Sequence, residues 1–382
     1  MKAQSIATQA SDPYRAGVEL GEGLSGLKPE IIFLFSTVHY SESNDLLEGM
    51  ADGLGQQSAL IVGNTGDGYY HQDSCGDIGC VAMGLNSNGA VEWNVVRKQG
   101  VKENPDGCLQ QAWSELKQKT EGDPDILFMF SDFRTDASLY EKVLREQIPI
   151  PVIGGIASDD NQMAGCGVYL NQDCIEDGLV LVSAKGAFKF SIHVGNSIST
   201  VGRAGTVERA EGTNIFEIDG LSAMDFIERE TGKPVLQSDR GVTSLTILQP
   251  ESSDIRRLRA IVPDFSVSER SIGLYGGIDQ GEQVQVCLAK PAELIAEVRN
   301  IANHCREQQF HPSAVLVVSC AGRKWLLGEQ IEKEVTELVQ GSWSNLPLAG
   351  FPSFGEIAPI PSKGGYSENL FHNMTYVLLL LG

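Results

Sequence analysis

The sequence has no long hydrophobic run. Its apolar stretches, such as Val377 to Leu381, are far too short to span a bilayer. The first residues, MKAQSIATQASDPY, lack the apolar central region of a secretory signal. We therefore expect a cytoplasmic protein that makes no membrane insertion.

Positive charge is scarce. Lysine and arginine number 29 against 50 acidic residues, which gives a formal net charge of −21. An acidic surface repels phosphate backbones, and we see no basic run that would reverse this field locally. The charge balance therefore argues against nucleic acid as a partner.

Cysteine pairs and histidine pairs with metal-ligand spacing are also missing. The eight cysteines contain no C-x-x-C, and no two of the six histidines lie three or four positions apart. In a chain this long, scattered cysteines are typical of reduced core thiols rather than of a disulfide or zinc framework.

The sequence further lacks a Walker loop, a dinucleotide-binding fingerprint and a G-x-S-x-G element. Ser36 and His39, just after an apolar strand, are the one candidate pair of nucleophile and base. No third group is readable, so we expect no enzyme, and a hydrolase that uses these two residues is kept as an alternative.

What the sequence does contain is a threefold internal repeat. Each copy begins with a proline and an apolar strand that ends in serine, continues through a helical segment, and closes with a second apolar strand and a glycine. The copies run from Pro29 to Gly63, from Pro124 to Gly154 and from Pro312 to Gly350. Near-continuous apolar strands indicate sheets covered on both faces.

After the glycine, each copy passes through a polar loop into a further apolar strand, at 77–84, 177–186 and 373–382. This order predicts an α/β fold with mixed sheets built from repeated β-α-β-loop-β units. Ser222 is expected to cap an amphipathic helix through Glu230, and Pro291 to open a long helix. We expect two domains, residues 1–220 and 221–382.

The glycine-containing loops after the second strands are the candidate ligand site. Ligands of α/β proteins bind at the carboxyl ends of strands, and glycine exposes backbone amides that suit an anionic ligand. The alternative is a set of tight turns whose glycines serve geometry alone. The candidate residues are Gly63, Asn64, Thr65, Gly66, Asp67, Gly154, Gly155, Ser158, Asp159, Gly350, Phe351, Phe354, Gly355 and Glu356.

Two further groups of residues lie near these loops. Phe351, Phe354 and Tyr366 either wall an apolar pocket or close the C-terminal core. His39, His71 and His372 are candidate axial ligands for haem. A lone histidine is more often structural, and the cofactor therefore stays open at this point.

Several of these elements resemble the FIST family. Gly350-Phe-Pro-Ser-Phe-Gly-Glu-Ile-Ala-Pro359 and Phe371-His-Asn-Met-Thr375 resemble the FIST C-terminal domain. The segments 29–36, Gly63 to Gly66, Gly154-Gly155 and 202–219 resemble the FIST N-terminal domain.

The resemblance implies an intracellular signal-transduction sensor that binds a small ligand, such as an amino acid, between two α/β domains. FIST domains occur fused to or encoded beside histidine kinases, diguanylate cyclases and chemotaxis proteins. The chain shows no readable kinase or cyclase segment, so its output is expected to reach a separate partner of that kind. Some members are haem-binding nitric-oxide sensors that control a histidine kinase, and this subgroup is kept as a second alternative.

Overall fold

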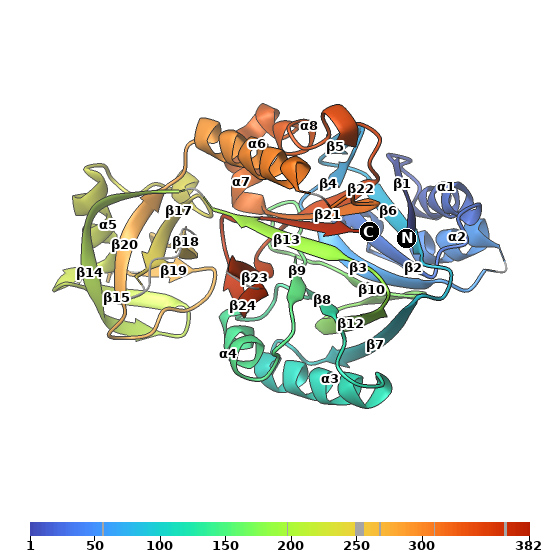
Figure 1. The fold of residues 1–382 in the computed structure, drawn as a ribbon. Coiled ribbons are helices and arrows are strands. Elements are labelled where there is room, and N and C mark those ends of the chain that lie inside the picture. Colours follow the sequence, from blue (N-terminus) through green and yellow to red (C-terminus); the bar gives the residue numbers. More distant parts are fainter. Residues whose placement is uncertain (56, 197, 249–255, 267–268, 309, 363–364) are drawn as a thin grey trace.

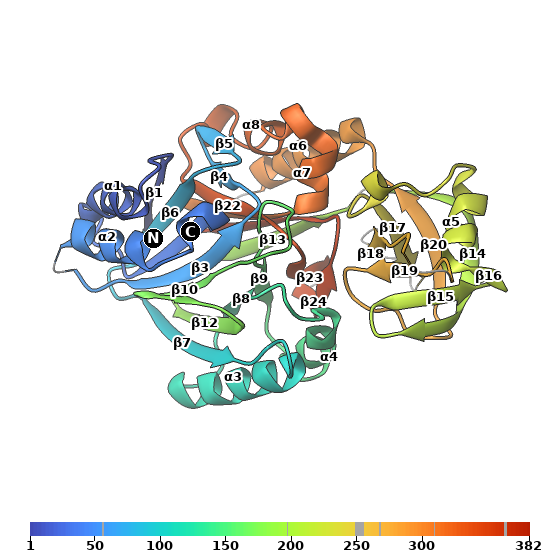
Figure 2. The ribbon, with the colours of Figure 1, turned by 180° about the vertical axis from the view of Figure 1, so that it is seen from behind.

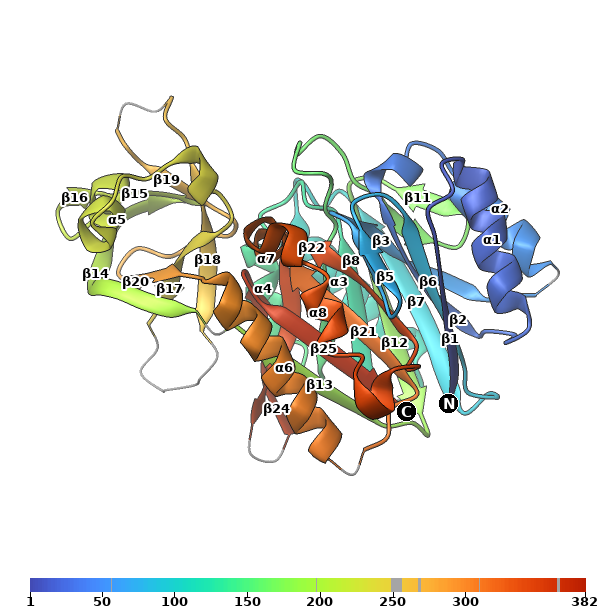
Figure 3. The ribbon, with the colours of Figure 1, turned by 90° about the horizontal axis from the view of Figure 1, so that it is seen from above.

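The computed structural model describes residues 1–55, 57–196, 198–248, 256–266, 269–308, 310–362 and 365–382. The chain forms two parts. The body contains the described residues of 1–196 and 290–382, and the insert contains those of 198–289. Figure 1 shows the insert, in yellow and green, to one side of the body, and the view from above in Figure 3 shows the same separation.

The body consists of three modules with the same order of elements: a strand, a helix, a strand, a helical segment, a strand, a β-hairpin and a last strand. Module 1 contains β1 (Lys2–Thr8), α1 (Pro13–Ser25), β2 (Ile31–Thr37), η1 (Val38–Tyr40), α2 (Asp45–Leu54), β3 (Leu60–Gly66), β4 (Tyr69–His71), β5 (Ser74–Gly76) and β6 (Cys80–Asn86). Module 2 contains β7 (Val91–Gln99), α3 (Pro105–Lys119), β8 (Ile126–Ser131), α4 (Ser138–Glu146), β9 (Val152–Ile156), β10 (Val168–Leu170), β11 (Asp173–Ile175) and β12 (Gly178–Gly186).

Module 3 has the same order, but the insert lies between its first strand and its first helix. Its elements are β13 (Phe190–Gly195), α6 (Pro291–Glu307), β21 (Ala314–Cys320), α7 (Ala321–Leu327), η3 (Gly328–Gln330), α8 (Lys333–Thr336), η4 (Gly341–Trp343), β22 (Leu348–Ser353), β23 (Glu356–Ser362), β24 (Gly365–His372) and β25 (Tyr376–Leu381).

The three modules exchange their hairpins in a ring. Each module pairs its two central strands in parallel and its last strand antiparallel to them. The hairpin of module 1 completes the sheet of module 3, that of module 2 completes module 1, and that of module 3 completes module 2. The resulting sheets are β1-β6-β2-β3-β10-β11, β7-β12-β8-β9-β23-β24 and β13-β25-β21-β22-β4-β5.

Alternation along each strand explains the layers of the body. On β2, Phe33 and Phe35 join a central core shared by all three sheets, whereas Ile32 and Leu34 pack under α1 and α2. The same division places α3 and α4 on the second sheet and α6 and α8 on the third. Figures 1 and 2 accordingly show the helices on three sides of the body, with the sheets between them.

The insert is a small barrel with a core of its own. Its sheet order is β14-β20-β17-β18-β19-β15-β16, and a further pairing of β14 with β15 closes it. Apolar side chains of the strands and of α5 fill its interior. The elements are β14 (Ser199–Glu211), β15 (Asn214–Ile218), β16 (Leu221–Ser222), α5 (Ala223–Thr231), η2 (Gln237–Asp239), β17 (Thr243–Ile247), β18 (Arg257–Pro263), β19 (Ile272–Leu274) and β20 (Gln283–Leu288).

A buried ion cluster holds the insert against the body. Glu141 on α4 accepts hydrogen bonds from Arg257 and Arg259 on β18, at 3.0 and 2.5 Å for the two ion pairs. Arg259 also donates to the Phe371 carbonyl, 3.0 Å away. Burial alone would raise the pKa of Glu141, but Arg259 and Arg257 together hold it below its usual range. The carboxylate is therefore charged and links two parts of the chain.

The α/β fold with mixed sheets built from repeated units is confirmed, as are the Ser222-capped α5 and the helix that begins at Pro291. The loop after each glycine contains a hairpin that the sequence did not reveal. The third repeat's helix was expected near Glu329 to Gln340. That range contains the short α8, and a further helix, α7, begins earlier, at Ala321 directly after β21. The expected domain boundary near residue 220 falls between β15 and β16, and segments on both sides of it contribute to the second and third sheets.

Among the described residues, no helix has both the length and the apolar character that a membrane crossing needs.

Gly154 gives a first test of the strand packing. A Cβ atom there would lie 1.9 Å from the Met129 carbonyl oxygen, and the backbone φ is +156°. We expect Gly154→Ala to lower the free energy of unfolding in urea by about 2–4 kcal/mol. Gly26→Ala is the matched control, because nothing lies within 4 Å of its Cβ position and its backbone is helical. Equal stability of the two variants would contradict the close approach of β9 to β8.

Glu141 gives a second test, of the contact between insert and body. In Glu141→Gln, the buried guanidinium group of Arg259 and the partly buried one of Arg257 lose their charge partner, which costs about 3–5 kcal/mol for a buried pair. We expect the free energy of unfolding in urea to fall by this amount and proteolysis between the two parts to become faster. Glu368→Gln, which removes only the surface ion pair with Arg145, should change stability by about 1 kcal/mol or less. If both variants behave alike, the cluster does not hold the insert.

Candidate functional site

The glycine loops of the three modules meet at one point. Ser158 of module 2 donates through its backbone N–H to the Thr65 carbonyl of module 1 at 3.0 Å. Its hydroxyl donates to the Pro352 carbonyl of module 3 at 2.6 Å and accepts from the Asp67 N–H at 2.7 Å. The strand registers make Asp67, Ser158 and Phe354 equivalent positions of the three modules. The loops therefore converge as the repeat suggested.

The convergence point is packed rather than open, since all fourteen predicted site residues are buried. The loop amides that were expected to face a ligand are largely used within the protein: the N–H groups of Thr65, Ile156 and Gly355 donate to Gly167, Gly355 and Ser353. Gly63 and Gly154 are required where the second strand approaches the first too closely for a side chain. The geometric interpretation of these two glycines therefore holds, and the loops do not form a cradle of free amides.

Three predicted residues leave a polar atom without a hydrogen bond. Asn64 Oδ1, Asp159 Oδ1 and Glu356 Oε1 are buried and have no partner among the described residues. Burial raises the pKa of Glu356 well above its usual range, which favours the neutral form of this carboxyl. Its Oε2 accepts from the Thr375 N–H at 3.2 Å.

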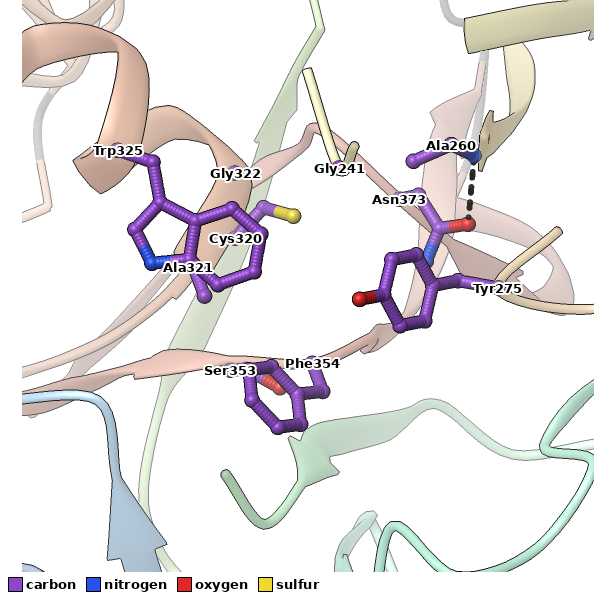
Figure 4. A pocket seen from close by; sticks show the side chains of 10 residues that line it. All are labelled: Gly241, Ala260, Tyr275, Cys320, Ala321, Gly322, Trp325, Ser353, Phe354 and Asn373. Carbon is purple, nitrogen blue, oxygen red and sulfur yellow. Dashed lines mark hydrogen bonds between the residues drawn. The ribbon is translucent and has the colours of Figure 1, made fainter. Parts of the chain in front are cut away.

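A small cavity lies beside the convergence point, where the insert meets module 3; we call it the aromatic pocket. The rings of Trp325, Tyr275 and Phe354 surround one space (Figure 4), with a volume of about 10 Å³. Its remaining lining residues are Gly241, Ala260, Cys320, Ala321, Gly322, Ser353 and Asn373. None of the ten carries a charged side chain at neutral pH, because burial raises the pKa of the Cys320 thiol far above its usual value.

Several elements place these walls. Cys320 ends β21, and Trp325 lies one turn into α7, which begins at the next residue. Phe354 occupies the turn between β22 and β23, and Tyr275 follows β19 of the insert. The Phe354 ring centroid lies 6.2 Å from that of Trp325 and 6.3 Å from that of Tyr275. Body and insert thus each contribute rings to one pocket.

Asp67 connects the first module to this pocket. Its Oδ2 accepts from the Trp325 indole N–H at 2.6 Å, and its Oδ1 pairs with Lys324 at 2.8 Å. Burial raises the pKa of Asp67, and Lys324 opposes that rise. The predicted loop acid therefore positions a wall of the pocket rather than facing a ligand itself.

A second cavity, the acidic cleft, also separates body from insert. It has a volume of about 380 Å³ and lies between α4 and the turns of the barrel. Its floor holds the Glu141, Arg257 and Arg259 cluster, and its charged rim residues are Asp106, Asp136, Lys142, Asp279 and Glu282. Both described cavities thus border the same contact between two parts of the chain.

The two other predicted aromatic residues do not reach the aromatic pocket. Phe351 stacks on Phe35 in the central core, with centroids 4.6 Å apart. Tyr366 stacks on Phe190 at 6.1 Å. Of the predicted cluster, only Phe354 lines the pocket, and the other two close the core as the alternative interpretation expected.

The candidate hydrolase pair is not brought together. Ser36 is fully buried, and its hydroxyl lies 2.6 Å from that of Tyr169. His39 is exposed, and its Nδ1 lies 3.3 Å from the Thr37 hydroxyl. Neither contact prepares the serine for nucleophilic attack by deprotonation through His39.

The three candidate haem ligands are scattered, since His71 lies on β4, His372 on β24 and His39 in η1. None borders the aromatic pocket or the acidic cleft, so neither cavity offers haem an axial histidine. His372 is fully buried, and its Nε2 lies 3.1 Å from the Ala358 carbonyl oxygen. Among the described residues, no group of three or more His, Cys, Asp or Glu could hold a metal ion.

Sequence reasoning predicted only Phe354 of the ten residues that line the aromatic pocket; the nine that it missed include Tyr275, Cys320, Trp325 and Asn373. Cys320 directly follows Ser319, the serine that ends the repeat's first strand, so its strand-end position was readable. Asn373 lies within the Phe371-His-Asn-Met-Thr375 element. Tyr275 and Trp325 gave no local signal, because the insert brings the first of them to the pocket from outside the repeat.

His372 provides a test by pH. Burial lowers its pKa from 6.5 to about 4, so the unfolded chain binds this proton more readily than the folded one. The associated stability is present above pH 6.5 and is lost as the pH falls toward 4, by roughly 3 kcal/mol in all. We expect His372→Gln to reduce the acid sensitivity of urea unfolding over this window. An unchanged pH profile would contradict a buried neutral imidazole.

Comparison with known proteins places the chain in a family. Residues 30–221 match the FIST N domain and residues 224–359 the FIST C domain. An uncharacterized protein of Methanocaldococcus jannaschii, MJ1623, is 23% identical over 231 residues, which are 57% of this chain and 44% of that protein. The chain thus spans less than half the length of this curated relative.

Two solved structures of Thermotoga maritima proteins, PurL complexed with ATP and PurLQS, resemble the chain only weakly. Their sequences are 11% and 10% identical to this chain. Each match extends over the whole of this chain and over 71% and 72% of the respective solved chain. The TM-score is 0.21 in both cases, which is too low to support an argument. The family matches, by contrast, extend over most of the sequence, and the chain belongs to the FIST family, whose domains are associated with sensing in signal transduction.

Proposed function

We propose that this protein is a cytoplasmic sensor that binds a small ligand in the aromatic pocket and regulates a separate signalling protein. One observation carries the proposal: the loops of all three modules converge beside a cavity that the insert completes. Concave, mostly apolar sites between two parts of a chain are the usual place for small-molecule binding.

The connection between the two parts suits a sensor. The chain passes from body to insert after β13 and returns before α6. Contacts across the boundary include the Glu141 cluster and the hydrogen bond from the Ala260 N–H to Asn373 Oδ1 at 3.1 Å. A ligand that binds one relative orientation better than another shifts the population toward it, and that orientation is the signal a partner reads.

The proposed partner is a histidine kinase or a diguanylate cyclase, in keeping with the family association with signal transduction. The proposed ligand is an amino acid or another small metabolite. A haem-based nitric-oxide sensor has no support from either cavity, because no histidine borders them.

A thermal-shift screen of amino acids and metabolites tests the ligand site. A ligand of the pocket should raise the melting temperature as its concentration increases. At a free ligand concentration a hundred times Kd, binding adds about 2.7 kcal/mol to the free energy of unfolding. We expect Phe354→Leu to abolish the rise. Tyr366→Leu is the matched control, because this ring lies outside the pocket. A ligand whose effect persists in Phe354→Leu and in Trp325→Leu would show that binding occurs elsewhere.

A further inference from the structure

The polar groups that line the aromatic pocket are already paired within the protein. The Asn373 amide accepts from the Ala260 N–H and donates to the His372 carbonyl, both at 3.1 Å. The Ser353 hydroxyl lies 2.6 Å from the Gly355 carbonyl oxygen, and the Trp325 indole N–H donates to Asp67. With no cationic side chain in the lining, an anionic ligand would be desolvated there without a charge partner. The chemistry of the pocket therefore disfavours an anion.

The ring walls favour a different class of ligand. Trp325, Tyr275 and Phe354 present three π-systems to one space (Figure 4), and tryptophan is the best of these rings for binding a cation. Asp67 accepts the hydrogen bond at the Nε1 edge of the indole, and the Trp325 side chain lines the pocket. A poorly hydrated organic cation loses little on leaving water and gains the attraction of the rings.

Charge beyond the lining is balanced nearby and negative at long range. Asp67 is paired with Lys324. After burial, which is the main cause of the raised pKa of Tyr275, Asp159 adds to the rise, while Arg240 donates to the Tyr275 hydroxyl and lowers it. Near the rings, Asp67 thus faces Lys324, and Asp159 and Arg240 act on Tyr275 in opposite directions. The net charge of −21 then sets the long-range field, which concentrates cations around the protein and repels anions.

We infer that the aromatic pocket binds a small methylated ammonium ion, of the chemical class of choline; this inference rests on the proposed function. The cavity of about 10 Å³ has room for about one water molecule. The ligand therefore enters by parting the insert from the body. The two parts would separate at the close approach of Gly322 in the body to Gly241 in the insert. A Cβ on Gly322 would lie 2.0 Å from the Gly241 carbonyl oxygen. The cation acts as a wedge that selects the more open orientation.

Calorimetric titration of the full chain with choline and with 3,3-dimethylbutan-1-ol, its uncharged isostere, tests this inference. The cation–π contribution predicts that choline binds about tenfold more tightly than the isostere. We expect Trp325→Leu and Phe354→Leu each to weaken choline binding by about tenfold or more, while Tyr366→Leu leaves it unchanged. Circular dichroism confirms that each variant is folded.

The outcomes separate this inference from the proposed function. Equal or tighter binding of the isostere overturns the choice of a cation but leaves an apolar ligand in the same pocket. Choline binding that survives Trp325→Leu and Phe354→Leu places the cation elsewhere on the acidic surface and overturns the inference. Absence of choline binding to the unmodified protein overturns it as well. The proposed function fails separately, if no metabolite that stabilises the protein depends on Phe354.

Discussion

The exchange of hairpins between modules is the constraint on which the rest of the structure depends. A parallel pair of strands with one antiparallel neighbour leaves an unpaired edge, and each module covers the edge of another with its hairpin. Unpaired strand edges are prone to uncontrolled association, and the ring covers three of them at once. Because the hairpins begin where the glycine loops end, the same exchange brings the three loops together at Ser158.

The insert breaks this internal symmetry and thereby creates a cavity. Thr37, Asp132 and Cys320 follow the serines that end the first strands of modules 1, 2 and 3. In module 2, Asp132 forms an ion pair with Arg134. In module 1, the Thr37 N–H donates a hydrogen bond to the Gly79 carbonyl. At Cys320 the barrel supplies Tyr275 instead, and a cavity with aromatic walls results. The aromatic pocket thus lies where one copy of the repeat differs from the other two.

The sequence predicted the features that depend on neighbouring residues and missed those that depend on residues far apart in the chain. Apolar runs and repeated prolines and glycines are local signals, and they revealed the strands and the threefold repeat. The strand β1 and the helix α1 were not predicted, because they precede Pro29, where the recognised repeat begins. Hairpin exchange was unreadable, since β4 and β22 are far apart in the chain yet pair through their backbones. The loop residues were found, but their burial depends on those exchanged strands.

The pairing of β4 with β22 also dictates when the chain can finish folding. During synthesis on the ribosome, residues 69–76 emerge long before 348–353, to which they pair. Until then the β4–β5 hairpin has no sheet to join, and an isolated hairpin is marginally stable in water. Pairing between strands that are distant in the sequence slows folding and leaves partly folded intermediates that are prone to aggregation. The sheet that β4 joins therefore stays incomplete until β22 has been synthesised.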